Sequence, residues 1–177
     1  MFFIYFFDII NKVLDMNFKL DYESLIGKLY LISNEIALTN IYFDKDIIKN
    51  EIYSNTSNEH LILAKKWLDN YFSHQNTEKI QLAIDIDCTR FQKIVFEEVN
   101  KIKYGQTITY KQLAQKVGKI LNKPKMSCQA IGQALKRNPI PIIIPCHRVV
   151  GTNDLGGYNK GIEIKKALLA FEKEGIK

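Results

Sequence analysis

The stretch that decides the fold of the second half of the chain is Asn138-Pro139-Ile140-Pro141-Ile142-Ile143-Ile144-Pro145-Cys146-His147-Arg148-Val149-Val150. A short, continuous apolar run is typical of a buried strand, which we predict over Ile142–Ile144. Pro145 has no backbone donor and marks the point where regular pairing stops. The strand would therefore hold Cys146 at the end of a rigid element.

Cys146 allows two interpretations. A lone free cysteine is most often an inert, buried core residue. Here His147 and Arg148 follow directly, and cationic neighbours lower the pKa of a thiol and favour the nucleophilic thiolate. Adjacent residues of a strand point to opposite faces, so a direct contact between Cys146 and His147 requires a turn at Pro145. Without that turn, a water must relay the proton.

The helical segments around this stretch are marked by their caps. Thr89 with Gln92 forms a capping box before an apolar stripe of Phe91, Val95, Val99 and Ile102. A second capping box begins at Thr109, and its helix is expected to end near Gly118. Ser127 can cap a helix over about 128–137. These last two helices form either a helix-turn-helix or an ordinary helix pair.

The motif Pro-Cys-His-Arg-Val, preceded by Asn-Pro and the Ile-rich run, closely resembles the O6-alkylguanine-DNA alkyltransferases (methylated-DNA–protein-cysteine methyltransferases). The resemblance extends from about Thr89 to Glu172, including Tyr-Gly-Gln-Thr-Ile-Thr-Tyr at 104–110, and is weaker before it. It implies DNA repair by one irreversible transfer of an alkyl group from O6-alkylguanine, and from O4-alkylthymine, to Cys146. It implies double-stranded DNA as the partner and no cofactor.

The resemblance also assigns roles to individual residues. Glu172 would accept a hydrogen bond from His147, which would deprotonate Cys146 through a water. Asn138 would hold the active-site turn, and Tyr110 would help to neutralise the leaving guanine. The implied walls of the alkylguanine pocket are Tyr158, Asn159, Lys160, Pro141 and Val149. Lys160 replaces a residue that is often glycine in the family, so larger adducts are expected to fit less well.

The helix after Ser127 is the expected DNA-binding element. Its small residues allow close approach to a sugar–phosphate backbone, and in the family the equivalent helix lies in the minor groove. The residues expected to contact DNA are Gln129, Cys128, Ala130, Gly132, Arg148 and Ser127. Gln129 stands where the family usually has an arginine that fills the space left by the extruded nucleotide. A shorter, uncharged side chain predicts weaker base extrusion.

We expect a mixed α/β protein of the α+β type, with an extension at 1–16, a scaffold domain at 17–87 and a mostly helical DNA-binding and alkyl-acceptor domain at 88–177. In the scaffold, the runs 25–32 and 36–43 predict a hairpin, 44–59 a loop, and 60–72 a helix with Trp67 in the core. Residues 80–86 fit a strand or an extended linker. A last helix is predicted over 162–173; Glu172 near its end opposes the helix dipole, so helix stability does not explain it.

The composition restricts the remaining possibilities. The net charge of +6 suits a polyanionic partner, although charge alone is a weak indication. Three cysteines without a framework spacing predict reduced thiols and therefore a cytoplasmic protein. The DNA partner that the resemblance implies would make it nucleoid-associated in a prokaryote. The histidines and cysteines form no metal-ligand pattern, so we predict no metal. The apolar block 1–7 is too short to span a membrane and lacks signal-peptide features; we interpret 1–16 as an amphipathic extension or an upstream translation start. We expect a monomer that binds no membrane.

Two other classes of protein need part of this pattern. A thiol hydrolase also uses a Cys–His pair, but it turns over many times. A non-catalytic helix-turn-helix damage sensor or regulator has no need of Cys146.

Overall fold

The computed structural model describes residues 17–43, 53–54 and 56–176. The chain divides into two compact units, Met1–Ile86 and Asp87–Lys177. The expected extension 1–16 and most of the expected loop at 44–59 lie outside the described residues.

The N-terminal unit is built on a four-stranded sheet with the order β3-β2-β1-β4. Strands β1 (Asn17–Ser24), β2 (Gly27–Ser33) and β3 (Leu38–Phe43) are antiparallel neighbours, while the short β4 (Tyr53–Ser54) pairs in parallel with β1. The predicted hairpin is β2–β3, but its first strand begins at Gly27 because Leu25 and Ile26 form the turn after β1. Strand β1 was not predicted, although its buried Phe18 and Tyr22 follow strand periodicity.

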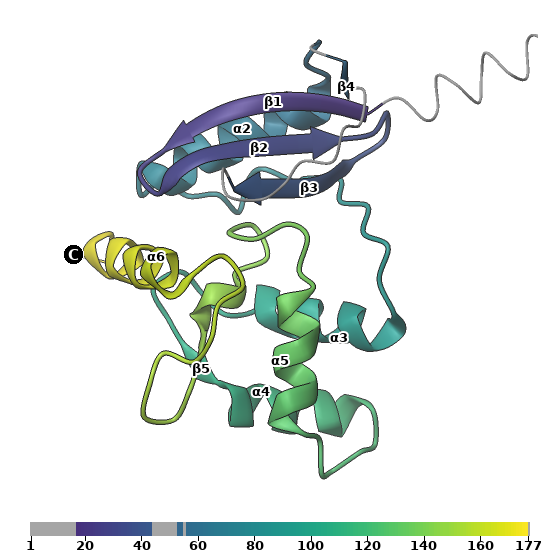
Figure 1. Ribbon diagram of the computed structural model, residues 1–177, viewed down its shortest axis with the longest axis vertical. Coiled ribbons are helices and arrows are strands. Elements are labelled where there is room, and N and C mark those ends of the chain that lie inside the picture. The colour runs from purple at the N-terminus through teal and green to yellow at the C-terminus, as the bar shows by residue number, and fades with distance from the viewer. Residues whose placement is uncertain (1–16, 44–52, 55, 177) are drawn as a thin grey trace, which may run out of the picture. The chain divides into compact units, whose positions relative to one another are not determined.

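Helix α2 (Glu59–Phe72) lies along the sheet, as Figure 1 shows, and Asn58 caps it by accepting a hydrogen bond from the amide of Leu61. Leu61, Ala64, Leu68 and Tyr71 form its buried face. The prediction of Trp67 in the core was wrong: the indole is half-buried and stacks on Tyr71 with ring centroids 5.6 Å apart. In the expected strand or linker at 80–86, only Ile84 forms a bridge, with Leu38.

The C-terminal unit is mostly helical, as predicted. Its elements are α3 (Arg90–Asn100), β5 (Ile108–Thr109), α4 (Tyr110–Ile120), α5 (Cys128–Lys136), a 3-10 turn η1 (Cys146–Arg148), β6 (Val149–Val150) and α6 (Ile162–Glu174). The capping boxes of Thr89 and Thr109 and the cap of Ser127 are confirmed. Helices α3, α4 and α5 pack against one another, and residues 121–127 form a longer connection than a typical helix-turn-helix has.

Helix α4 ends near Gly118, as predicted, but the glycine is not its cap. The helix continues to Ile120, and the left-handed residue that follows is Asn122, with φ 53°. A Cβ on Gly118 would lie 2.6 Å from the carbonyl oxygen of Lys123. The absence of a side chain at Gly118 therefore lets the following loop pass close to the helix, and the glycine does not act as a cap.

The predicted strand at Ile142–Ile144 is also wrong. The segment is a tight turn in which Ile142 has φ 75° and the amide of Ile144 donates to the carbonyl of Ile140. Three prolines remove the donors that a central strand requires. The burial part of the prediction holds, because Ile142 and Ile144 are both buried.

Candidate active site

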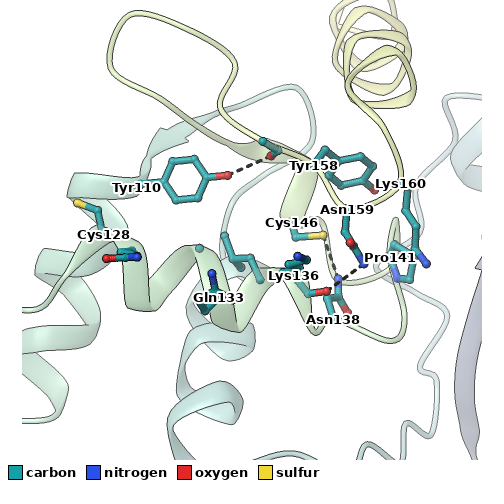
Figure 2. Close-up of a pocket in the computed structure, with 14 residues that line it drawn as sticks. Tyr110, Cys128, Gln133, Lys136, Asn138, Pro141, Cys146, Tyr158, Asn159 and Lys160 are labelled. Atoms are coloured by element: carbon teal, nitrogen blue, oxygen red, sulfur yellow. Dashed lines mark hydrogen bonds between the residues drawn. The ribbon is translucent and has the colours of Figure 1, made fainter.

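The side chain of Asn138 organises the turn that carries Cys146. Its amide nitrogen donates to the carbonyl of Ile144 (2.9 Å) and to Sγ of Cys146 (3.1 Å), and its oxygen accepts from the amide of Ile140 (3.0 Å). Asn138 is itself buried. The side-chain amide of Asn138 thus supplies hydrogen bonds that the prolines prevent the backbone from making. Its bond to Sγ, drawn in Figure 2, fixes the position of the thiol.

Cys146 begins η1, so the chain does turn after Pro145. The thiol is buried, and burial raises its pKa, although the Asn138 hydrogen bond and the charge of Lys165 act in the opposite direction. The resting side chain is therefore a protonated thiol. It needs a base to become a nucleophile.

Glu172 is the centre of a buried charged cluster. Its Oε1 lies 2.7 Å from Nε2 of His147, and the guanidinium of Arg148 donates to both carboxylate oxygens at 2.9–3.1 Å. The amide of Gly105 donates to Oε2 (2.9 Å). Burial opposes ionisation, but the hydrogen bonds from His147 and Arg148 outweigh it and lower the pKa of Glu172 to about 2. The carboxylate is ionised and completely buried, so Glu172 is not a solvated surface residue.

The protonation state of His147 follows from this cluster. The ring is completely buried, and burial lowers its pKa below the ordinary value despite the nearby carboxylate. An ionised Glu172 can only accept, so Nε2 carries the proton of the neutral ring. Nδ1 is then an acceptor, and it has no hydrogen-bond partner within the described part of the chain. His147 is thus a neutral base with one free lone pair.

Arg148 does not face solvent, and its prediction as a DNA contact was wrong. Besides the pair with Glu172, its Nη1 donates to the carbonyl of Ile102 (2.6 Å), and its guanidinium carbon lies 5.7 Å from the ring centroid of Tyr104. Since Glu172 neutralises it, Arg148 also fails as the predicted cation beside Cys146. Its structural role is to hold η1, the turn that follows α3, and α6 together.

A cavity of about 670 Å³ opens beside the thiol. It is lined by Tyr110, Cys128, Gln129, Gly132, Gln133, Leu135, Lys136, Asn138, Pro141, Cys146, Gly157, Tyr158, Asn159 and Lys160. Four of the five expected pocket residues are among them, and Val149 is not. Val149 is fully buried in β6, so its side chain cannot reach a ligand in this cavity.

The loop between β6 and α6 forms one wall of the cavity. The hydroxyl of Tyr110 donates to the carbonyl of Gly157 (3.1 Å), and Asn159 donates to the carbonyl of Lys136 on α5 (3.1 Å). Gly156 has φ 65°, and a Cβ there would lie 2.6 Å from Cε2 of Tyr110. The buried hydroxyl of Tyr158 makes no hydrogen bond of ordinary geometry with the described residues, and burial together with the charge of an ionised Cys146 raises its pKa.

Lys165 on α6 is a site residue that sequence reasoning missed. It is completely buried, and its Nζ donates to the carbonyls of Val149 (2.6 Å) and Gly157 (3.2 Å). A signal was present: positions 165, 168, 169 and 172 follow helix periodicity, so the lysine shares the buried face with Leu168, Leu169 and Glu172.

Two family models cover most of this chain. The DNA binding domain of 6-O-methylguanine DNA methyltransferase matches residues 90–174, and the ribonuclease-like domain of the same enzyme matches residues 19–86. The chain belongs to the methylated-DNA–protein-cysteine methyltransferase family. The family member of Metallosphaera sedula is 37% identical over 156 residues, which are 88% of this chain and 93% of that protein.

Solved structures of the family have the same fold. A crystal structure of Mycobacterium tuberculosis OGT in complex with DNA superposes with a TM-score of 0.76 at 32% identity, covering 90% of this chain and 94% of that one. An O6-methylguanine DNA methyltransferase from Methanococcus jannaschii gives a TM-score of 0.64 at 31% identity, with 87% and 93% covered. The expected α+β fold class is thereby confirmed.

Within this methyltransferase fold, the residues of α5 that were expected to contact DNA line two separate hollows, and Ser127 lies at the start of the helix. Cys128, Gln129 and Gly132 line the cavity of Cys146, together with Gln133, Leu135 and Lys136, which were not predicted. Ser127 is the N-cap, with its hydroxyl accepting from the amide of Gln129. Ala130 lines a second hollow, which it shares with Arg90, Phe91, Leu121, Lys123, Lys125 and Met126.

Across residues 17–43, 53–54 and 56–176, no helix is long and apolar enough to cross a bilayer. The same residues contain no cluster of three His, Cys, Asp or Glu side chains that could hold a metal ion.

Proposed function

We propose that this chain repairs alkylated DNA by transferring the alkyl group of O6-alkylguanine to Cys146. The observation that carries the proposal is a buried thiol at a cavity large enough for a purine base, followed in the chain by a neutral imidazole whose Nε2 bonds to an ionised carboxylate. Ligand cavities in proteins have volumes of roughly 300–1,000 Å³, a range that includes this one. Membership in the methyltransferase family supports the same activity.

The reaction begins with extrusion of the damaged base, because the O6 atom cannot be reached within the base stack. His147 then takes the Cys146 proton at Nδ1 through a water. Glu172 and Arg148 keep the ring in the tautomer that leaves Nδ1 unprotonated. Charge develops on the imidazole only during this step, and the adjacent carboxylate stabilises it.

The thiolate attacks the alkyl carbon. The new S–C bond forms as the C–O bond breaks, and the electron pair of that bond passes to O6 of the departing guanine. A donor near the purine must neutralise this charge, and the hydroxyl of Tyr110, which lines the cavity, serves this purpose in our proposal. Backbone amides near Tyr158 are the second source of donors.

The product is a thioether on Cys146. Neutral water does not hydrolyse a thioether, so each molecule reacts once and the protein acts as a stoichiometric acceptor. We extend the substrate class to O4-alkylthymine, which offers the same alkyl–oxygen bond. We further propose that the protein acts as a monomer on double-stranded DNA in the cytoplasm, on the nucleoid if the source is prokaryotic.

DNA is bound by α5 in this proposal. Cys128, Ala130 and Gly132 keep that helix slim enough to enter a groove, and Ser127 lies at its first turn. Gln129 is exposed and lines the cavity, and in this proposal it refills the stack by hydrogen bonding to the orphaned base, without the charge of an arginine.

The deciding experiment is mass spectrometry of the intact chain and of its peptides after incubation with DNA that contains O6-methylguanine. We expect one added CH2 per chain, located on Cys146, and no further turnover with excess DNA. Cys146→Ser should bind the same DNA but remain unmodified, and Cys88→Ser should react like the parent. Tight binding of O6-methylguanine DNA with an unmodified thiol would instead indicate the non-catalytic sensor, and continued release of product would indicate a hydrolase.

A further inference from the structure

Lys165 is a completely buried charge of the C-terminal unit that the mechanism above does not use. Its Nζ donates to two neutral carbonyls, of Val149 and Gly157, and it forms no ion pair with a carboxylate among the described residues. A buried charge is costly unless a compensating charge lies near. The fold retains this charge directly beside the reactive turn.

The other buried cationic residues near Cys146 carry no uncompensated charge. Arg148 is paired with Glu172, and His147 is neutral because burial lowers its pKa. The charged or titratable groups that face Lys165 are Cys146 and His147 of η1, Asp154 of the cavity-wall loop and Tyr110 of α4, whose ring centroid lies 5.7 Å from Nζ. Among the buried residues that the structure describes, Lys165 is therefore the cation near the sulfur that no carboxylate pairs with directly.

We propose that Lys165 is a positioning residue with two tasks: it stabilises the Cys146 thiolate by its charge, and it fixes the loop that carries Tyr158 over the sulfur. The biological role of this arrangement rests on the proposed alkyl transfer, but ionisation of the Cys146 thiol can be measured without that reaction. When His147 removes the proton, the resulting thiolate and the ammonium group compensate each other. The charge that is costly in the resting protein is thus matched in the reactive state.

The second task follows from the carbonyl of Gly157. This oxygen accepts from both Tyr110 (3.1 Å) and Lys165 (3.2 Å), while Lys165 also bonds the carbonyl of Val149, close to η1. One ammonium group thereby ties the cavity-wall loop to the strand that continues from the nucleophile. Tyr158, the residue after Gly157, is held with its buried hydroxyl beside the thiol.

Burial lowers the pKa of Lys165 to about 8. The side chain is thus mostly charged at pH 7 and loses its charge within the next pH units. Arginine keeps its charge throughout this range. The two residues therefore give a test in which charge and packing are separated.

The experiment measures the rate at which iodoacetamide alkylates Cys146 from pH 6 to pH 10, followed by peptide mass spectrometry in the full-length chain. We expect Lys165→Met to slow the reaction about tenfold or more at pH 7, because a thiol pKa raised by one unit lowers the thiolate fraction tenfold. Lys165→Arg should restore much of the rate at pH 7. Lys166→Met is the matched control, since this exposed neighbour pairs with Glu163 and should react like the parent.

A folded Lys165→Met variant with the pH profile of the parent would overturn the proposal. If that variant does not fold, Lys165→Gln is measured, since it can still donate to a carbonyl but carries no charge. The parent chain gives a second, independent test. If its alkylation rate rises with pH in two ionisation steps, the pairing of Lys165 with the thiol is supported; a single step at the pKa of the denatured thiol would refute it. Iodoacetamide requires no DNA, so loss of methyl transfer with intact Lys165 dependence would refute the proposed function alone.

Discussion

Replacing Glu172 by glutamine should be the most damaging single-atom change in the C-terminal unit. The carboxyl pKa falls from an ordinary 4.5 to about 2 in the folded chain. A lowering of this size corresponds to about 3 kcal/mol of folding stability at neutral pH. Glutamine also leaves the Arg148 guanidinium buried without its anion, and breaking a buried pair typically costs about 3–5 kcal/mol. We therefore expect Glu172→Gln to lower the free energy of unfolding by about 3–5 kcal/mol at pH 7.

The contribution of Glu172 to folding stability should depend on pH in one direction. A carboxyl whose pKa is lower in the folded state stabilises the fold fully above its unfolded pKa, and this contribution disappears as the pH falls toward the folded pKa. The parent should thus lose about 3 kcal/mol through Glu172 between about pH 4.5 and pH 2. The glutamine variant should lack this part of the acid transition. Its stability should approach that of the parent as the pH falls.

The assay is urea unfolding at several pH values, followed by far-ultraviolet circular dichroism. Tryptophan fluorescence is unsuitable, because Trp67 lies in the N-terminal unit. Glu163→Gln is the control, because Glu163 is an exposed glutamate of the same helix. Within the described part of the chain its one ion pair is with Lys166 at the surface, so the effect should stay below about 0.5 kcal/mol. Equal stabilities for the two variants at pH 7, or equal acid slopes for Glu172→Gln and the parent, would refute the reasoning.

Four further predictions concern the site. Glu172→Gln should slow methyl transfer more than it weakens DNA binding, as measured by single-turnover kinetics and fluorescence anisotropy; equal rates from pH 6 to pH 9 would exclude a role for the carboxylate in activating His147. Because burial lowers the pKa of His147, the parent rate should stay constant down to about pH 6.5 and fall only below it as the base becomes protonated, whereas a decline that begins above pH 7 would contradict a neutral resting imidazole. Asn138→Ala removes three hydrogen bonds at a buried position and should cost about 2–4 kcal/mol in urea unfolding as well as the transfer activity; normal activity would show that the turn holds without it. Gln129→Arg should accelerate repair of duplex DNA more than of single strands and should steepen the salt dependence by about one phosphate contact, and an equal gain on both substrates would point to simple charge attraction.

The second thiol of the cavity calls for an explicit control in these assays. Cys128 lines the same cavity as Cys146 and is exposed at the first turn of α5. Alkyl transfer to Cys128 in a Cys146→Ala variant would show that the cavity, and not the Asn138 turn, selects the acceptor. We expect none, because only Cys146 has the amide donor of Asn138 at its sulfur and the base in the next residue.

The sequence alone determined the elements that local physics defines. Capping boxes at Thr89 and Thr109 located two helix starts. The threonine hydroxyl and the side-chain amide of the glutamine three residues later satisfy unpaired backbone donors at the start of a helix, whatever the helix packs against. The β2–β3 hairpin and α2 followed from periodicity in the same way. The motif around Cys146 was specific enough to indicate the family before any geometry was known.

Tertiary structure decided which side chains meet as partners. The apolar run before Cys146 became a turn because the Asn138 side chain, two residues before Ile140 and six before Ile144, bonds to both in place of a strand partner. Arg148 became an internal residue because the carboxylate of Glu172, 24 residues further along the chain, pairs with its guanidinium. Lys165 entered the site because the loop before α6 brings the carbonyl of Gly157 onto its ammonium group. In each case several partners were possible for one charge or donor, and packing determined which of them it meets. Sequence spacing shows which residues are neighbours within a helix or strand, but it does not show which charges meet across the fold.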